Sequence, residues 1–164
     1  MPQAPMLLDA AAIMTRTVVT VGPDDTVAVV ARVLTDRGIS ALPVVAPDGA
    51  LLGMISEGDL MRPFGEKSAL RRDWWLNMIA EGTDLSQEFL DYIRLDRHRA
   101  RDLMTPTVIT APDTASIGEL ADLLSQHRIK RVPILRAGKL VGIVSRADIV
   151  RALAHGDAVA VPKP

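Results

Sequence analysis

The stretch Met14-Thr15-Arg16-Thr17-Val18-Val19-Thr20 recurs later in the chain as Met104-Thr105-Pro106-Thr107-Val108-Ile109-Thr110. The same register continues beyond these stretches. It matches Ala31 with Ala121, Leu34 with Leu124, Ile39 with Ile129 and Pro43 with Pro133. After one deleted residue it matches Gly49, Leu51, Gly53, Ser56, Asp59 and Arg62 with Gly138, Leu140, Gly142, Ser145, Asp148 and Arg151. A register held over so many positions indicates an internal duplication, so each copy is expected to form one structural unit.

Each copy predicts the element order β-α-β-β-α. Apolar residues at three- and four-residue spacing predict a helix before Gly38, a residue typical of helix C-terminal ends. Two apolar runs joined by Pro47-Asp48-Gly49 predict a hairpin. The expected elements cover residues 17–21, 26–37, 41–45, 51–55 and a helix from 56 in the first copy, and 116–127, 131–135, 140–144 and 145–153 in the second, with a turn at Ala137-Gly138.

Three motifs accompany the duplication. They are Asp-x-Met-Thr at Asp102–Thr105 with a degraded copy at Ala12–Thr15, an apolar strand containing Pro43 or Pro133, and a closing Gly-x-x-Ser-x-x-Asp. Together they resemble a tandem pair of cystathionine β-synthase (CBS) domains, a Bateman module. The resemblance implies an α/β (α+β) fold of two β-α-β-β-α CBS repeats, residues 9–62 and 102–155, packed about a pseudo-twofold axis with two symmetric clefts between them.

The segment between the repeats, residues 63–101, belongs to neither copy. It holds all five aromatic residues of the chain: Phe64, Trp74, Trp75, Phe89 and Tyr92. Helices are expected over 67–80 and 86–95, the second with Ser86 as its N-cap. This Trp-rich helical insert is expected to pack on the module, on a second chain or on a partner, whereas residues 156–164 resemble a linker.

Composition excludes several classes of protein. The chain has 164 residues and a net charge of −1, which gives no overall electrostatic basis for binding nucleic acid or an anionic membrane. It has no Cys, so disulfide scaffolds and thiol chemistry are excluded, and it shows no secretory signal or membrane span. No catalytic motif, phosphate loop or metal-binding spacing occurs. We therefore expect a cytoplasmic protein that is not an enzyme and has no catalytic cofactor.

The strongest site candidates are the segments Ser56–Asp59 and Ser145–Asp148, each of which follows an apolar strand and opens a helix. One interpretation is a capping box, in which Ser and Asp satisfy helix N-terminal N–H groups. The other is ligand binding, because a helix N-terminus favours phosphate and an Asp one turn on can accept ribose hydroxyls. The family resemblance favours nucleotide binding, since CBS pairs use these positions for the phosphate and ribose of adenosine ligands.

The two copies differ in charge around these segments. Glu57 follows Ser56, whereas Arg146 follows Ser145. Lys130 and Arg131 also begin the first strand of the second-copy hairpin, so the second copy is expected to hold phosphate better. The favoured nucleotide site comprises Thr105, Val108, Lys130, Arg131, Val132, Pro133, Ser145, Arg146 and Asp148. The weaker site comprises Thr15, Val18, Ser40, Ala41, Leu42, Pro43, Ser56 and Asp59.

The function expected from these features is that of a regulatory module that binds an adenine nucleotide (AMP, ADP or ATP) or a related adenosyl ligand. It would sense that ligand and transmit its state to a partner or attached effector domain, and it is expected to form a homodimer. Two alternatives remain open. One is an interaction module acting through the Trp-rich insert, and the other is a nucleic-acid binder using the basic stretch Arg94–Arg101.

Overall fold

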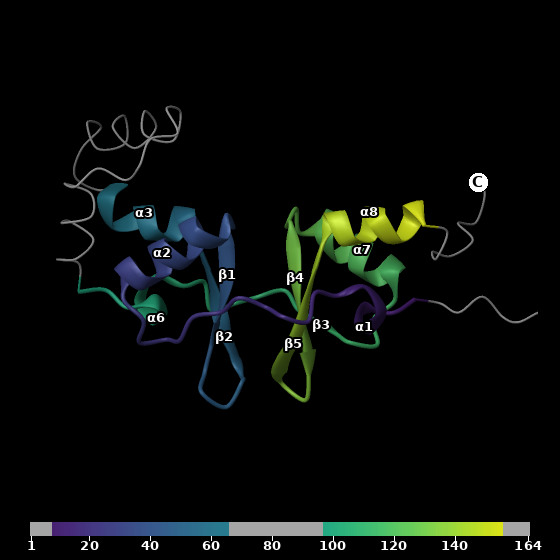
Figure 1. Ribbon diagram of the computed structural model, residues 1–164, viewed down its shortest axis with the longest axis horizontal. Coiled ribbons are helices and arrows are strands. Elements are labelled where there is room, and N and C mark those ends of the chain that lie inside the picture. The colour runs from purple at the N-terminus through teal and green to yellow at the C-terminus, as the bar shows by residue number, and fades with distance from the viewer. Residues whose placement is uncertain (1–7, 66–96, 156–164) are drawn as a thin grey trace, which may run out of the picture. The chain divides into compact units, whose positions relative to one another are not determined.

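The computed structural model describes residues 8–65 and 97–155 (Figure 1). The helices expected over 67–80 and 86–95 lie outside the described residues. Contacts divide the described chain into two compact units. The first-repeat unit comprises residues 19–47, 51–65 and 97–108, and the second-repeat unit comprises 8–18, 48–50 and 109–155. Each unit therefore takes its opening segment from the other copy of the repeat, a division that differs from the repeat boundaries expected from the sequence.

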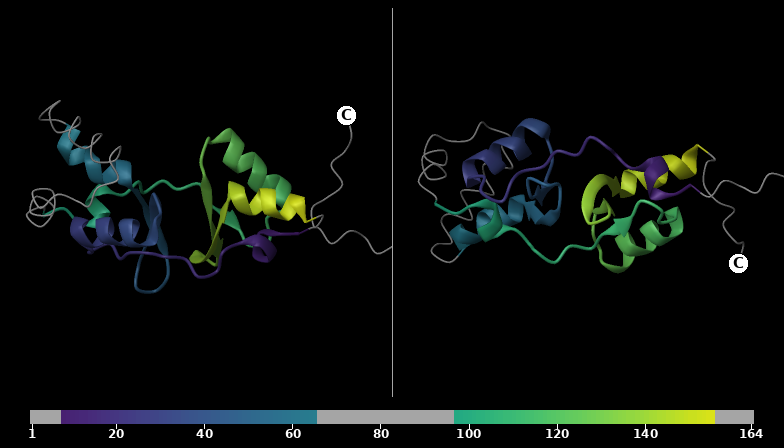
Figure 2. Two further views of the ribbon diagram at one scale, coloured as in Figure 1. Left: turned by 45° about the horizontal axis from the view of Figure 1, so that its top comes forward. Right: turned by 90° about the horizontal axis from the view of Figure 1, so that it is seen from below.

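The first-repeat unit is built on a two-stranded antiparallel sheet. Strand β1 (Ala41–Val45) pairs with β2 (Leu51–Ser56), and Leu42 lies opposite Ile55. Helices α2 (Val27–Arg37) and α3 (Glu57–Gly65) pack on one side of this hairpin, and the short helix α6 (Ala100–Leu103) contacts β2 and α3 (Figure 2).

The second-repeat unit has the same plan with one more strand. Its sheet has the order β3-β4-β5, in which β3 (Ala111–Pro112) is parallel to β4 (Arg131–Arg136), and β4 is antiparallel to β5 (Lys139–Ser145). Helices α7 (Ile117–Gln126) and α8 (Arg146–Ala154) contact each other and the strands, and α1 (Ala10–Ile13) contacts β5 and α8. In the β4–β5 turn Ala137 and Gly138 both have positive φ, as a type I′ hairpin requires.

Each unit encloses its own apolar core. In the first, residues spaced along one face of α2 meet strand residues that are fully buried: Val27, Val30 and Leu34 against Leu42, Val44 and Ile55. In the second, the matching set is Ile117, Leu120 and Leu124 against Val132, Ile134 and Val144. Full burial of one such side chain contributes about 1.5–3 kcal/mol, so these two cores hold the hairpins and helices in place.

Most of the expected elements are confirmed. The helices after Thr26 and Ser116, both hairpins and the helices that follow Ser56 and Ser145 all form. Thr26 and Ser116 are the N-caps, accepting hydrogen bonds from the N–H groups of Val29 (3.2 Å) and Glu119 (3.2 Å).

The strand expected over 17–21 is wrong. Only Val21 pairs with the sheet, where its N–H donates to Pro43 and its carbonyl accepts from Val45. The run is divided between the two units at Val18, and the next N–H, that of Gly22, donates instead to Asp25 Oδ2 at 2.7 Å. The pairing therefore stops after one residue, and the counterpart β3 in the second-repeat unit is two residues long.

Candidate functional site

The Met-Thr segment of each copy docks on the strand that leads to the Ser-x-x-Asp of the other copy. In the second-repeat unit, the N–H of Thr15 donates to Ile143 O (2.9 Å) and the N–H of Ile143 donates to Thr15 O (3.0 Å). Met14 is buried there against Gly142, where a Cβ would lie 2.7 Å from the Met14 Cγ. Thr15 therefore belongs to the same unit as Ser145.

The first-repeat unit repeats this arrangement with the other threonine. The N–H of Thr105 donates to Met54 O (2.8 Å), and the N–H of Met54 donates to Thr105 O (3.0 Å). Met104 lies against Gly53 of the same strand. The sequence grouped Thr105 with Ser145 and Thr15 with Ser56, whereas the structure places each threonine in the opposite unit. The same division separates Val108 from Asp148 and Val18 from Asp59.

Ser145 and Asp148 form a capping box at the start of α8. The N–H and the Oγ of Ser145 donate to Asp148 Oδ2 at 2.7 and 2.8 Å, and the N–H of Asp148 donates to Ser145 Oγ at 3.3 Å. Arg151, one turn later, places Nη1 3.1 Å from Asp148 Oδ1. Asp148 is the buried charged residue of the described chain, with 9% of its surface exposed.

Ser56 and Asp59 make the same box at the start of α3. The N–H and the Oγ of Ser56 donate to Asp59 Oδ2 at 2.8 and 2.9 Å, and the N–H of Asp59 donates back at 3.3 Å. Asp59 is less buried than Asp148. Both segments therefore satisfy the capping interpretation, and the question is what each box leaves available to a ligand.

The capping box at Ser145 occupies the Ser145 hydroxyl but leaves part of the Asp148 carboxylate available to a ligand. The single hydrogen of the Ser145 hydroxyl is directed to Asp148, so it does not serve as a free donor to phosphate. An ionised carboxylate has about four acceptor positions, and three donors from Ser145 and Arg151 occupy Asp148. Asp148 Oδ1 can therefore accept one more hydrogen bond, or two if the Arg151 side chain moves away.

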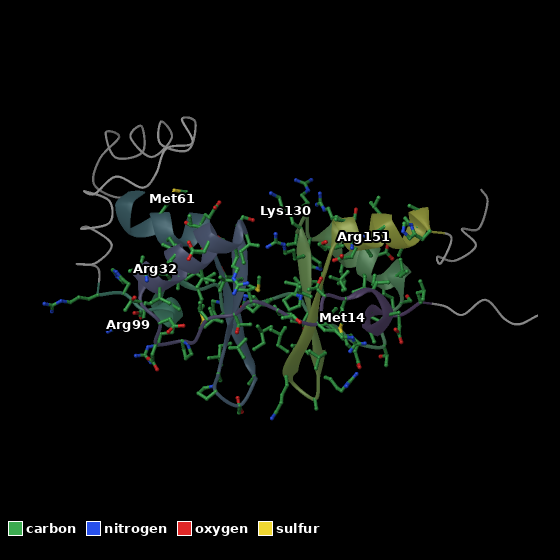
Figure 3. All side chains as sticks on the ribbon, in the orientation of Figure 1. Met14, Arg32, Met61, Arg99, Lys130 and Arg151 are labelled. Atoms are coloured by element: carbon green, nitrogen blue, oxygen red, sulfur yellow. The ribbon has the colours of Figure 1, made fainter. Side chains whose placement is uncertain are left out.

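The cations expected near Ser145 lie beside it. Arg131 is the antiparallel partner of Ser145, and the N–H of Arg146 donates to Lys130 O at 3.3 Å. The Arg146 side chain turns back, with Nε donating to Ile129 O at 3.1 Å. Figure 3 shows Lys130 at this end of the second-repeat unit. An anion at the start of α8 would therefore meet cationic side chains.

Some of the uncharged residues expected in the two sites lie beside the Ser-x-x-Asp segments, and others are buried in the cores. The carbonyl of Ser40 accepts from the N–H of Glu57, the residue after Ser56, at 3.0 Å, and Ala41 pairs with Ser56 across the hairpin. Four further residues of the expected sites have fully buried side chains: Leu42, Pro43, Val132 and Pro133. They support the strands from the core and offer at most their backbone to a ligand.

Sequence reasoning missed Arg151, the ion-pair partner of Asp148. The signal was present, because an acidic residue followed three positions later by a basic one faces it on a helix. Within residues 8–65 and 97–155 no cluster of three or more His, Asp or Glu side chains is arranged to hold a metal ion. In the same part of the chain, no helix has the length and apolar character needed to cross a membrane.

A family model described as "CBS domain" matches residues 10–66 and 100–155. The chain therefore belongs to the CBS domain family and carries two copies of the domain. Among curated proteins it is similar to the uncharacterized protein MJ1426 of Methanocaldococcus jannaschii, at 32% identity over 154 residues that cover 86% of this chain and 88% of that protein.

Solved structures agree with this assignment. The CBS domain of a CBS domain containing membrane protein from Sphaerobacter thermophilus matches with a TM-score of 0.66 and 29% identity, covering 90% of this chain and 88% of that one. CBSX2 of Arabidopsis thaliana, solved in complex with AMP, matches with a TM-score of 0.66 and 25% identity, covering 90% of this chain and 96% of that one. Members of this fold thus include an AMP-binding protein.

Proposed function

We propose that this chain is a regulatory CBS module that binds an adenine nucleotide or related adenosyl ligand, principally beside Ser145 and Asp148. The observation that carries the proposal is a capping box that follows a core strand, retains an acceptor position on Asp148 and lies beside Lys130 and Arg146. The AMP complex of CBSX2 supports an adenosyl ligand.

In this proposal, Asp148 accepts a ribose hydroxyl and the cations receive the phosphate. Arg151 already donates to a carboxylate oxygen of Asp148, so the free energies of the ion pair and of the ribose hydrogen bond have to be compared. The Arg151 side chain is 65% exposed and the Asp148 side chain is 10% exposed, so the pair is solvated on one side only and is worth more than the about 0.2–1 kcal/mol of a fully exposed pair. A charge-assisted hydrogen bond from ribose contributes about 1.5–3 kcal/mol, and Oδ1 keeps an acceptor position beside Arg151, so ribose shares this oxygen with Arg151. Thr15, exposed in the same unit, takes the position that the sequence assigned to Thr105.

Regulation then follows from differential affinity. A ligand shifts an equilibrium only if it binds one conformation more tightly than another, and the module would pass that shift to a partner or attached domain. We also propose a homodimer. The large apolar residues that α8 exposes, Val150 at 64% and Leu153 at 49%, offer a surface that a second copy could cover.

The test is calorimetric titration of AMP and ATP into the wild type and the D148A and D59A variants. Loss of the Asp148 hydrogen bond is expected to lower affinity about ten- to a hundredfold, and D59A is expected to do less because Glu57 repels phosphate at the first site. E119A is the matched control, since it removes the acidic member of another capping box, at the start of α7.

Equal losses of affinity in D148A and E119A would show that capping, and not ligand contact, explains the effect. If D148A and D59A both bind like the wild type, the two segments are structural caps. If no adenine nucleotide or S-adenosylmethionine raises the melting temperature, the proposal is wrong.

A further inference from the structure

Arg151 donates to the carboxylate oxygen of Asp148 that the capping box leaves open. Asp148 Oδ2 accepts hydrogen bonds from the N–H and the Oγ of Ser145 at 2.7 and 2.8 Å, whereas Oδ1 accepts one from Arg151 Nη1 at 3.1 Å. Each oxygen of an ionised carboxylate has about two acceptor positions. Oδ2 is therefore fully used, and Oδ1 has one position left for a ligand.

A capping box does not need this cation. At the start of α7 the N–H and the Oγ of Ser116 donate to Glu119 Oε2 at 2.7 and 3.0 Å, which is the same pair of hydrogen bonds. The residue three positions after Glu119 is Asp122, an acidic residue. A complete box therefore forms without an arginine, so capping does not explain the contact between Arg151 and Asp148.

The two carboxylates differ in burial. The Asp148 side chain is 10% exposed, whereas Glu119 lies on the surface. A buried carboxylate without a counter-ion is costly, and removing one member of a buried ion pair is strongly destabilising. Arg151, which lies on α8 (Figure 3), therefore compensates the charge of Asp148. A sugar hydroxyl is neutral and cannot take over that role, so Arg151 stays on Oδ1 when a ribose binds.

We propose that Arg151 restricts Asp148 to one sugar hydroxyl of the ligand. This inference rests on the proposed function and defines the sugar that its site accepts. A ribose carries two neighbouring hydroxyls, and an Asp148 with Oδ1 wholly free could accept both of them. With Arg151 in place only one hydroxyl is bound, so a nucleotide that lacks the other loses no contact with Asp148. The second-repeat unit therefore accepts a singly deoxygenated adenine nucleotide nearly as well as the ribonucleotide, and Arg151 sets this specificity.

The test is calorimetric titration, at neutral pH, of AMP and its 2′-deoxy, 3′-deoxy and 2′,3′-dideoxy analogues into the full chain. All four share the adenine and the phosphate, so their relative affinities report the sugar contacts alone. For the wild type, the tighter of the two singly deoxygenated nucleotides is expected to bind within about twofold of AMP, and the dideoxy nucleotide about ten- to a hundredfold more weakly. In R151M, which frees the second position on Oδ1, both singly deoxygenated nucleotides are expected to bind about tenfold more weakly than AMP.

Two further variants control for charge and stability. R151K keeps a cation at this position and is expected to keep the relative affinities of the wild type. R136M is the matched control, because Arg136 is 61% exposed and pairs with a largely buried aspartate, Asp113, in the same unit. It is expected to leave the relative affinities unchanged. The melting temperature of each variant shows whether it is folded.

The outcomes separate this inference from the proposed function. If both singly deoxygenated nucleotides bind the wild type about tenfold more weakly than AMP, Asp148 accepts both hydroxyls despite Arg151, and the inference is wrong while the proposed function stands. That comparison needs no variant, so it decides even where R151M does not fold. The inference is equally wrong if the relative affinities of a folded R151M match those of the wild type. If the dideoxy nucleotide binds as tightly as AMP, Asp148 does not hold the sugar, and if no adenine nucleotide binds, the proposed function itself fails.

Discussion

The docking of Met14 on Gly142 makes a quantitative prediction about stability. The three atoms nearest to a Cβ added at Gly142 all belong to the Met14 side chain, with Cγ at 2.7 Å, Cβ at 3.0 Å and Sδ closer still. Met14 is 8% exposed and cannot swing into solvent without leaving its pocket. Overpacking of this kind costs about 1–3 kcal/mol, so G142A is expected to lower the melting temperature by about 2–12 °C for a chain of this size.

A double-mutant cycle tests the cause. M14A alone is expected to cost about 2–5 kcal/mol, because it empties a buried position. M14A removes the Sδ and Cγ contacts and leaves only the Cβ contact at 3.0 Å, so the two losses should not fully add: the M14A/G142A double variant should be more stable than the sum of the single losses predicts, with a coupling of about 1–3 kcal/mol. Urea denaturation of the four proteins measures this coupling.

Gly53 provides the contrasting case in the same molecule. There the nearest atom to an added Cβ is the backbone carbonyl oxygen of Thr105 at 2.7 Å, ahead of the Met104 Sδ at 2.8 Å. Truncating Met104 cannot move that oxygen, so M104A is not expected to rescue G53A. Simple additivity at the Met14–Gly142 pair, or rescue at both pairs, would refute the packing argument.

Two further predictions concern stability and assembly. Hydrogen bonds from the backbone and side chain of Ser116 lower the pKa of Glu119, so their contribution to stability is present above the ordinary carboxyl pKa and is lost as pH falls through the lower folded value. Urea unfolding between about pH 7 and pH 3 should therefore show a smaller decrease in the free energy of unfolding for E119Q than for the wild type. S116A should cost about 1 kcal/mol at neutral pH. Light scattering at micromolar concentration should give a dimer that V150K and L153K each convert to monomer, and a wild-type monomer would contradict the α8 interface.

The sequence predicted the features that depend on neighbouring residues. The helices that begin after Thr26 and Ser116 were predicted from apolar spacing, and the turn at Ala137-Gly138 from its residues, and all three are confirmed. The capping box at Ser145 was also foreseen, although its hydroxyl proved to be directed to Asp148. The one-turn helices α1 and α6 were missed, because four residues give too short a pattern for periodicity to detect.

The position of the Met-Thr segments could not be read from the duplication. A repeat shows which residues are equivalent, but not whether an opening segment packs on its own copy or on the other, since the same Met, Thr and Gly residues satisfy either choice. In the structure each opening segment packs on the other copy: residues 15–21 connect the pairing of Thr15 with Ile143 in one unit to the pairing of Val21 with Val44 in the other. The predicted strand over 17–21 failed for the same reason, because a segment that crosses between units cannot pair along its whole length with one sheet.

Because each Met-Thr segment docks on the other copy, a ligand beside Asp148 would have a backbone route to the first-repeat unit. The bridge between Thr15 and Ile143 lies two residues before Ser145 on β5, and the bridge between Thr105 and Met54 lies two residues before Ser56 on β2. A shift of the Ser145 end of β5 would therefore reach Thr15 through this bridge, and from Thr15 the chain continues to Val21 and α2 of the first-repeat unit. The reverse route runs from Ser56 through Thr105 to β3 and α7. If the proposed module couples its two Ser-x-x-Asp segments, that coupling is reciprocal by thermodynamic necessity, and these two stretches of backbone are the covalent routes by which it would pass.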